Sequence, residues 1–307
     1  MSVTDLGRTP GRSTRATVAH AAVALCAVIS ILTTVGIVLT LLVDAIDFFG
    51  AVDVVEFLTG TTWRPTNEPV SFGVLPLISG TLIVTIGSAL IALPVGLLTA
   101  IYLSEFASER RRAVLKPALE VLAGVPTVIY GYFALVYITP AIDVFLPVST
   151  FNALSASIVV GIMIIPMVSS ISEDAMHAVP DSLRQAGYGL GATKFTVSTS
   201  VVVPAALSGI FSSFILALSR AIGETMAVTI AAGQTPRLVD LTDPSGMFLE
   251  SIQTMTAAMV QIGASDVVGQ SIEYKSLFAV GLTLFVMTLA MNVLSEWIAR
   301  RYREEYE

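Results

Sequence analysis

Six long stretches of the chain are almost free of charged side chains. A helix that crosses a bilayer needs roughly 20 apolar residues, and each stretch reaches that length. The stretches are 16–43, 70–104, 121–142, 144–172, 195–236 and 276–295. We therefore expect an all-α polytopic membrane protein with six transmembrane helices. Gly73, Pro76 and Gly80 at the front of the second stretch favour an interfacial lead-in before its membrane helix.

Lysine and arginine are distributed unevenly between the two sides of these predicted helices. If both termini are cytoplasmic, twelve basic residues lie inside: Arg8, Arg12, Arg15, Arg110, Arg111, Arg112, Lys116, Arg184, Lys194, Arg300, Arg301 and Arg303. Only Arg64, Arg237 and Lys275 then lie outside. Positive charge favours the cytoplasmic side. We expect cytoplasmic tails at 1–15 and 301–307 around a permease domain at 16–300, in the plasma membrane.

The composition agrees with a membrane protein and narrows its chemistry. Of the 307 residues, 54% are hydrophobic and 13% are charged, whereas soluble domains carry about 25% charged residues. The net charge of −7 includes no basic patch, which argues against a nucleic-acid partner. One cysteine, Cys26, and two histidines leave no internal disulfide and no histidine-rich metal site. We expect neither a metal nor a cofactor.

The predicted outer segments are acidic. They hold Asp44, Asp47, Asp53, Glu56, Glu68, Asp143, Asp240, Asp243, Glu250, Asp266 and Glu273. Against three basic residues, these acids would repel an anion that approaches unaided. An anionic substrate would therefore have to be delivered by a binding protein.

Arg220 and Glu224 stand inside the fifth apolar stretch. Residues four apart on a helix share a face, so we expect the two charges to point the same way. A charge at membrane depth costs about 2.5–3.5 kcal/mol, so the pair must face protein or water. Either Arg220 contacts or gates an anion with Glu224 modulating the charge, or the two neutralise each other or pair across a subunit interface. A helix over 201–233 would be ~50 Å long, and Gly223 is a candidate break.

The loop between the fourth and fifth stretches has the features of a docking site. Pro180, Asp181 and Ser182 are typical of a helix start, and Gly191 can end that helix. On the cytoplasmic face, a short helix followed by a turn could seat a partner protein.

This loop resembles the coupling motif of ABC-transporter permease subunits. The family pattern is Glu-Ala-Ala, three residues, Gly, nine residues, and Ile-x-Leu-Pro. The chain has Gln185-Ala186-Gly187, then Gly191, then three valines and Pro204 at the same spacing. It departs in having Gln for Glu, Gly for the second Ala, and Val at both aliphatic positions.

Further segments resemble phosphate-specific permeases of the PstC type. The sequences "SRAIGETMAV", "FLTGTTWRP" and "EVLAGVPTVIYGYFAL" carry the likeness, which extends from Phe57 to Arg300. The resemblance implies a type I ABC importer permease fold with a coupling loop at 173–200. It also implies that Arg220 and Glu224 matter for transport. The implied ATPase-coupling residues are Gln185, Ala186, Gly187, Gly191, Ala192, Thr193 and Pro204.

The resemblance also implies partners. These are a second permease subunit of the PstA type, a pair of ATPase subunits of the PstB type, and an extracytoplasmic phosphate-binding protein of the PstS type. The chain has no G-x-x-x-x-G-K-[ST] motif, so we expect a permease that is not itself an enzyme and borrows ATP hydrolysis. Alternatives are a permease for molybdate, tungstate or sulfate, and an ion-coupled secondary anion transporter or channel. No nucleophile or acid–base set supports a membrane enzyme.

Overall fold

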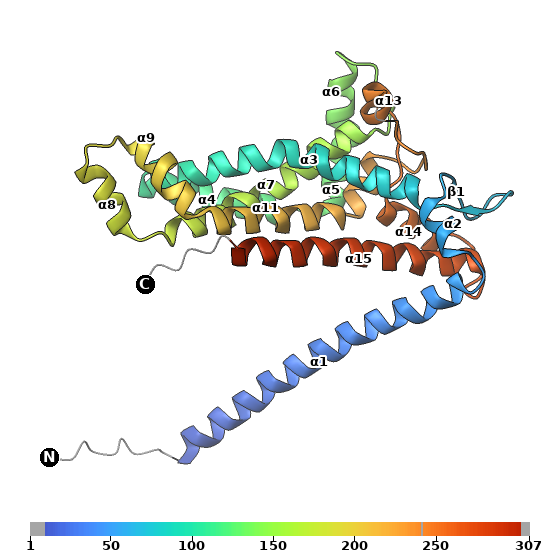
Figure 1. The fold of residues 1–307 in the computed structure, drawn as a ribbon, viewed down its shortest axis with the longest axis horizontal. Helices are drawn as coiled ribbons and strands as arrows, with labels where there is room; N and C mark the ends of the chain where they lie inside the picture. Colours follow the sequence, from blue (N-terminus) through green and yellow to red (C-terminus); the bar gives the residue numbers. More distant parts are fainter. Residues whose placement is uncertain (1–9, 241, 302–307) are drawn as a thin grey trace.

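The computed structural model describes residues 10–240 and 242–301. Its long helices lie side by side in one bundle, and only α1 leaves the bundle at an angle (Figure 1). Residues 1–9 and 302–307 of the expected tails lie outside the described residues, while residues 10–15 already belong to α1. The elements in chain order, with η marking a π-helical segment, are α1 (Pro10–Phe49), α2 (Val54–Thr59), β1 (Trp63–Arg64), β2 (Ser71–Phe72), α3 (Leu75–Ile101), η1 (Tyr102–Phe106), α4 (Glu109–Gly124), α5 (Thr127–Phe133), η2 (Ala134–Ile138), α6 (Thr139–Asp143), α7 (Ala153–His177), α8 (Asp181–Gly189), α9 (Lys194–Val197), η3 (Ser198–Val202), α10 (Val203–Ala205), α11 (Leu207–Ile222), α12 (Met226–Ala231), α13 (Pro244–Leu249), α14 (Met255–Gly263) and α15 (Ile272–Arg301).

Four helices in the described part of the chain are long and apolar enough to cross a membrane. They cover Ala16–Phe49, Leu75–Phe106, Ala153–His177 and Ile272–Ile298. Two further spans exist only as bent pairs, Glu109–Gly124 with Thr127–Asp143 and Lys194–Ala205 with Leu207–Ile222. The prediction of six spans therefore corresponds to four continuous helices and two broken ones.

The breaks have local causes. The first bent pair turns by 89° at Pro126, because proline disfavours the helical conformation of the residue before it. The second turns by 70° at Ala206, shortly after Pro204. Helix α11 ends at Gly223, the predicted break. The expectation of a helix from residue 144 was wrong, since α7 starts only after Asn152, whose side chain accepts a hydrogen bond from the Ser155 amide at 2.7 Å.

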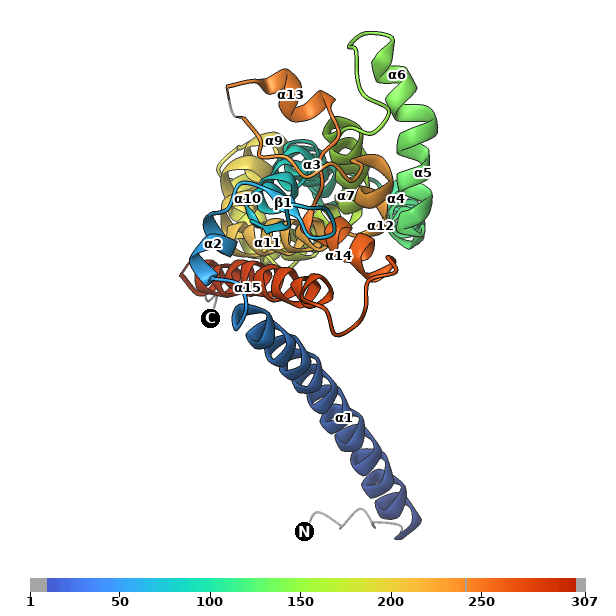
Figure 2. The same ribbon diagram turned by 90° about the vertical axis from the view of Figure 1, so that its right-hand side faces the viewer.

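Helices α3 and α7 form the centre of the bundle (Figures 1 and 2). They approach closely at Gly96 of α3, where a Cβ atom would lie 2.7 Å from Val168 of α7. In a bilayer, helices associate through such close packing and through interhelical hydrogen bonds rather than by expulsion of water. Ser172 of α7 and Ser213 of α11 supply one such hydrogen bond, at 2.8 Å, so α11 is joined to the same unit.

An aromatic cluster closes one end of the bundle, which we call the hairpin end. Strands β1 and β2 pair antiparallel with Trp63 opposite Phe72. Phe48, at the end of α1, contacts Phe57 of α2 and Phe72 edge-to-face, with ring centroids 5.6 and 5.2 Å apart. The Nζ atom of Lys275 lies 2.9 Å from the Asp47 carboxylate and ties α15 to α1 at this end.

Helices α8 and α9 lie at the opposite end, which we call the α8 end (Figure 1). The first described turn of α1 and the last turn of α15 also point towards the α8 end (Figure 1). The described ends of these two helices thus lie on the same side as the predicted coupling loop, and the membrane side on which they lie stays a prediction.

Candidate functional site: the Arg220 cavity and the α8 end

Arg220 and Glu224 do not share a helix face, contrary to the expectation. Arg220 lies in the last turn of α11, which ends at Ile222. Glu224 lies in the short connection before α12, which begins at Met226. Because Gly223 interrupts the helix, the 3.6-residue periodicity that would align the two side chains does not continue to Glu224.

Arg220 is exposed and lines a cavity of about 320 Å³ between α4, α7 and α11. The other cavity residues are Lys116, Leu119, Glu120, Ala123, Met163, Pro166, Met167, Ser170, Ile171 and Glu173. Within residues 10–240 and 242–301, no carboxylate forms an ion pair with Arg220. Arg220 thus shares the cavity wall with one further cation, Lys116, and with the carboxylates Glu120 and Glu173.

Glu224 has a different environment. Its side chain is buried, and its Oε1 atom accepts a hydrogen bond from the Ala227 amide at 3.2 Å, in the first turn of α12. Its backbone carbonyl accepts a hydrogen bond from the Thr256 hydroxyl at 2.7 Å. Glu224 thus holds the start of α12 and connects it to α14, and it does not neutralise Arg220.

Sequence reasoning missed the charges that meet beside Arg220. Glu173 of α7 is fully buried, and its carboxylate lies 2.6 Å from Arg112 Nη2 and 3.2 Å from Lys116 Nζ. Arg112, which the sequence placed only among the basic residues of the predicted inner side, therefore also joins α4 to α7. The available signal was spacing, since residues four apart on α4 face the same way, but the partner on α7 could not be read from it.

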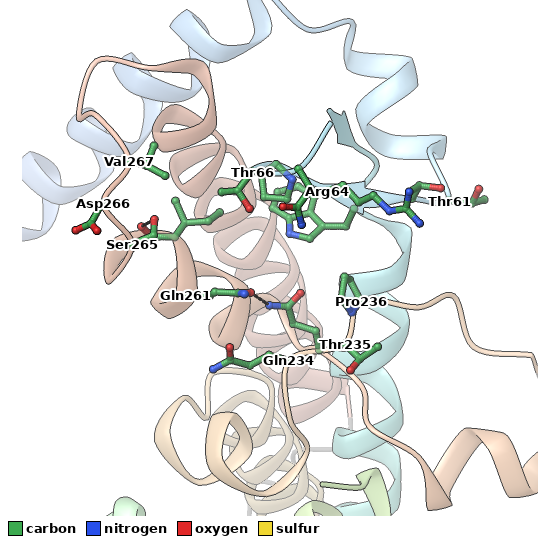
Figure 3. A pocket seen from close by; sticks show the side chains of 16 residues that line it. Thr61, Arg64, Thr66, Gln234, Thr235, Pro236, Gln261, Ser265, Asp266 and Val267 are labelled. Carbon is green, nitrogen blue, oxygen red and sulfur yellow. Dashed lines mark hydrogen bonds between the residues drawn. The ribbon is translucent and has the colours of Figure 1, made fainter. Parts of the chain in front are cut away.

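A second and larger pocket opens at the hairpin end (Figure 3). Its volume is about 720 Å³, and loops 61–67, 234–236 and 261–267 contribute most of its wall. The polar side chains that line it are Thr61, Thr62, Arg64, Thr66, Asn67, Gln234, Thr235, Gln253, Gln261, Ser265 and Asp266. The Gln253 amide donates to Gln261 Oε1 at 2.5 Å, which is the dashed line in Figure 3. Uncharged hydrogen-bonding groups predominate in this pocket, with Arg64 and Asp266 as its two charged members.

The loop before α13 is acidic and keeps its charge. Hydrogen bonds from the side chain and amide of Thr242 lower the pKa of Asp240 below its ordinary value. The Ser245 hydroxyl and the Gly246 amide lower the pKa of Asp243 in the same way. Hydrogen bonds that favour the charged form cause both shifts, so these carboxylates stay ionised in mildly acidic solution.

The predicted coupling residues gather at the α8 end. Gln185 and Ala186 are exposed on α8, and Gly187 faces Val197, where a Cβ atom would lie 2.9 Å from that side chain. Gly191 adopts a left-handed backbone with φ of +79° and ends the helix, as predicted. Ala192 follows the turn, the Thr193 hydroxyl accepts a hydrogen bond from the Thr196 amide at 3.3 Å, and Pro204 lies at the 70° bend.

The fold and these sites define a polytopic membrane protein of the permease class. Residues 92–304 match the family described as "Binding-protein-dependent transport system inner membrane component", and the chain belongs to this family. It is a multi-pass protein of the plasma membrane.

Relatives in two bacteria extend the match to most of the chain. The chain is 37% identical to the probable ABC transporter permease protein YqgH of Bacillus subtilis, over 90% of this chain and 88% of that protein. It is 33% identical to the phosphate transport system permease protein PstC of Mesorhizobium japonicum, over 80% and 78% of the two chains.

Solved structures confirm the fold of a type I ABC importer permease. A bacterial alginate ABC transporter has a TM-score of 0.65 at 14% identity, covering 94% of this chain and 96% of that one. The MetNI methionine ABC transporter has a TM-score of 0.55 at 17% identity, covering 78% and 100%. At these identities, the likeness concerns the fold alone.

Proposed function

We propose that this chain is a permease subunit of an ATP-driven importer for inorganic phosphate. The observation that carries the proposal is its 33% identity to a phosphate permease over four-fifths of its length. Arg220 supports an anionic substrate, since it lines the cavity and no carboxylate in the described ranges forms an ion pair with it, Glu120 and Glu173 of the same wall included. A guanidinium fork offers several donors in the geometry that a tetrahedral oxyanion accepts.

In this proposal the hairpin end faces outwards and the α8 end faces the cytoplasm. The excess of lysine and arginine towards the α8 end supports this orientation. The 720 Å³ pocket then receives the anion, and its mostly neutral hydrogen-bonding wall binds it without trapping it. Arg220 stands further along the path, and Glu224 holds α12 in place beside it.

The proposed transporter contains further proteins. An extracytoplasmic phosphate-binding protein delivers the anion to the acidic outer face, and a second permease subunit completes the pore. Of two ATPase subunits, one docks on the predicted coupling residues from Gln185 to Thr193. ATP binding and hydrolysis on these partners move that segment and alternate the access of the path.

Reconstitution in liposomes tests the proposal. The chain is combined with the second permease, the ATPase subunits and the binding protein, and uptake of labelled phosphate is measured with and without ATP. We expect ATP-dependent uptake that excess sulfate, molybdate or tungstate does not inhibit. Competition by one of these anions would transfer the substrate assignment to it. Uptake without the ATPase subunits would contradict an ATP-driven importer in favour of a secondary transporter.

A further inference from the structure

Arg184 of α8 is mostly buried and makes several hydrogen bonds, which an exposed docking helix does not require of its side chains. Its side chain is only 14% exposed. The guanidinium donates to the carbonyl oxygen of Val179 at 2.6 Å and to that of Met176 at 2.8 Å. The Met176 carbonyl lies in the last turn of α7 and also accepts a hydrogen bond from the Val179 amide at 3.3 Å, and the Val179 carbonyl lies in the turn that follows. Arg184 therefore caps α7 from outside that helix.

The same guanidinium reaches the end of α3. Its Nη2 and Nε atoms lie 3.0 and 3.3 Å from Glu105 Oε1. Glu105 stands on η1, the π-helical extension of α3, and its side chain is 5% exposed. Within the described residues, Arg184 is the cation that pairs with Glu105. A buried carboxylate is stable only while such a partner stays in place.

One side chain thus connects three elements. It belongs to α8, caps α7 and pairs with the extension of α3. Helices α3 and α7 pack closely, and α7 supplies one wall of the Arg220 cavity. If α8 moved alone, Glu105 would lose its ion-pair partner, and the carbonyl oxygens of Met176 and Val179 would each lose the Arg184 donor. A displacement of α8 is therefore less costly when α3 and α7 move with it.

We propose that Arg184 and Glu105 form the linkage that transmits the movement of α8 to the α3–α7 pair. Arg184 is a positioning residue in this proposal, because it acts through the helices and not on the substrate. The proposal rests on the proposed function, in which ATPase subunits move α8. The pair explains how motion at an exposed helix reaches the walls of the Arg220 cavity.

Asp181 provides a matched control on the same guanidinium. Its carboxylate lies 3.2 Å from Arg184 Nη1, but its side chain is 85% exposed. Exposed ion pairs contribute little, because water screens both charges. Asp181→Asn therefore removes a contact of Arg184 without breaking the linkage.

The test measures ATP hydrolysis and phosphate uptake side by side in the reconstituted complex. We expect Glu105→Gln and Arg184→Gln complexes to hydrolyse ATP while the phosphate moved per ATP falls about tenfold. The exchanged pair, Glu105→Arg with Arg184→Glu, should recover part of the lost ratio, and Asp181→Asn should keep the wild-type ratio. A purely structural role would lower both activities together and leave the ratio unchanged.

Glu105→Gln decides the outcome if Arg184→Gln does not assemble, because glutamine keeps the size of the buried side chain. A normal ratio in Glu105→Gln would overturn the linkage. Failure of Glu105→Gln to assemble would also overturn it, since the pair would then serve folding alone.

A second readout does not depend on the substrate. Spin labels at Gly189→Cys on α8 and Leu98→Cys on α3, in a Cys26→Ser background, report the distance between the two helices as ATP is added. We expect one distance throughout in the otherwise unchanged chain and a second distance in Glu105→Gln. No phosphate uptake by the wild-type complex would contradict the proposed function, whereas equal distances in both proteins would contradict the linkage.

Discussion

At the scale of single residues, Arg220 has to face protein or water. A charge at membrane depth costs about 2.5–3.5 kcal/mol on insertion scales, and α11 places this side chain on a cavity wall rather than against a carboxylate. An arginine on the wall of a cavity, with no carboxylate paired to it in the described residues, is suited to an anion in transit.

We expect Arg220→Ala to abolish phosphate uptake while the complex still assembles. Arg220→Lys keeps the charge but loses the planar fork, so it should transport more slowly than wild type and faster than Arg220→Ala. Uptake of labelled phosphate by proteoliposomes measures both. Arg110→Ala, an exposed arginine of α4, is the control and should transport normally. Wild-type kinetics in Arg220→Ala would remove Arg220 from the path.

Gly191 is needed because its backbone adopts a conformation that other residues rarely adopt. Its φ of +79° is left-handed, yet a Cβ atom there would meet open space. Gly191→Ala should therefore destabilise the turn after α8 by about 1–2 kcal/mol without a clash, and weaken binding of the ATPase subunits. Gly189→Ala also adds a Cβ atom in open space, but at a helical position. Co-purification of the ATPase with each variant tests this, and equal losses in both would point to surface shape instead.

At the scale of elements, buried charge holds α4 against α7. Glu173 is enclosed, whereas the side chains of Arg112 and Lys116 are 32% and 33% exposed. The cations can therefore regain water when the pair is broken, and the carboxylate cannot. Losing the cations should therefore lower the free energy of unfolding more than losing the carboxylate does.

We expect removal of the cations to be the more damaging change. The double variant Arg112→Ala with Lys116→Ala strands a buried carboxylate and should cost about 3–5 kcal/mol. Glu173→Gln leaves two partly solvated cations and should cost about 1 kcal/mol. Thermal unfolding of the purified protein in detergent gives the order. If Glu173→Gln were the less stable of the two, the energetic roles assigned to this cluster would be reversed.

At the scale of the whole molecule, orientation follows from the distribution of lysine and arginine. The α8 end carries most of them, so it should lie in the cytoplasm. Cys26 is the single cysteine, and Cys26→Ser provides a background for labelling. A membrane-impermeant maleimide should label Asn67→Cys at the hairpin end in intact cells, and Gly189→Cys on α8 only after permeabilisation. The opposite pattern would invert the proposed direction of transport.

Most of the fold could be predicted from the sequence, but only part of the site could. The apolar stretches located the spanning segments, and Gly223 and Gly191 were identified as helix ends from residue type alone. Asn152 shows the limit, since a polar residue inside an apolar stretch is a helix cap only if the chain before it is not helical. The shared helix face expected for Arg220 and Glu224 was wrong for the same reason, because it assumed a continuous helix.

The spanning segments and their expected side of the membrane could be predicted from the amino-acid pattern because the cost of placing a residue in hydrocarbon depends on that residue and its near neighbours. Two kinds of feature are decided only by the tertiary structure. Prolines mark the breaks at Pro126 and near Ala206, but the angle of each bend depends on what packs beyond it. The ion pairs of Glu173 with Arg112 and of Arg184 with Glu105 join helices that are far apart in the chain. Such contacts are selected by the distance between packed elements, which no local pattern encodes.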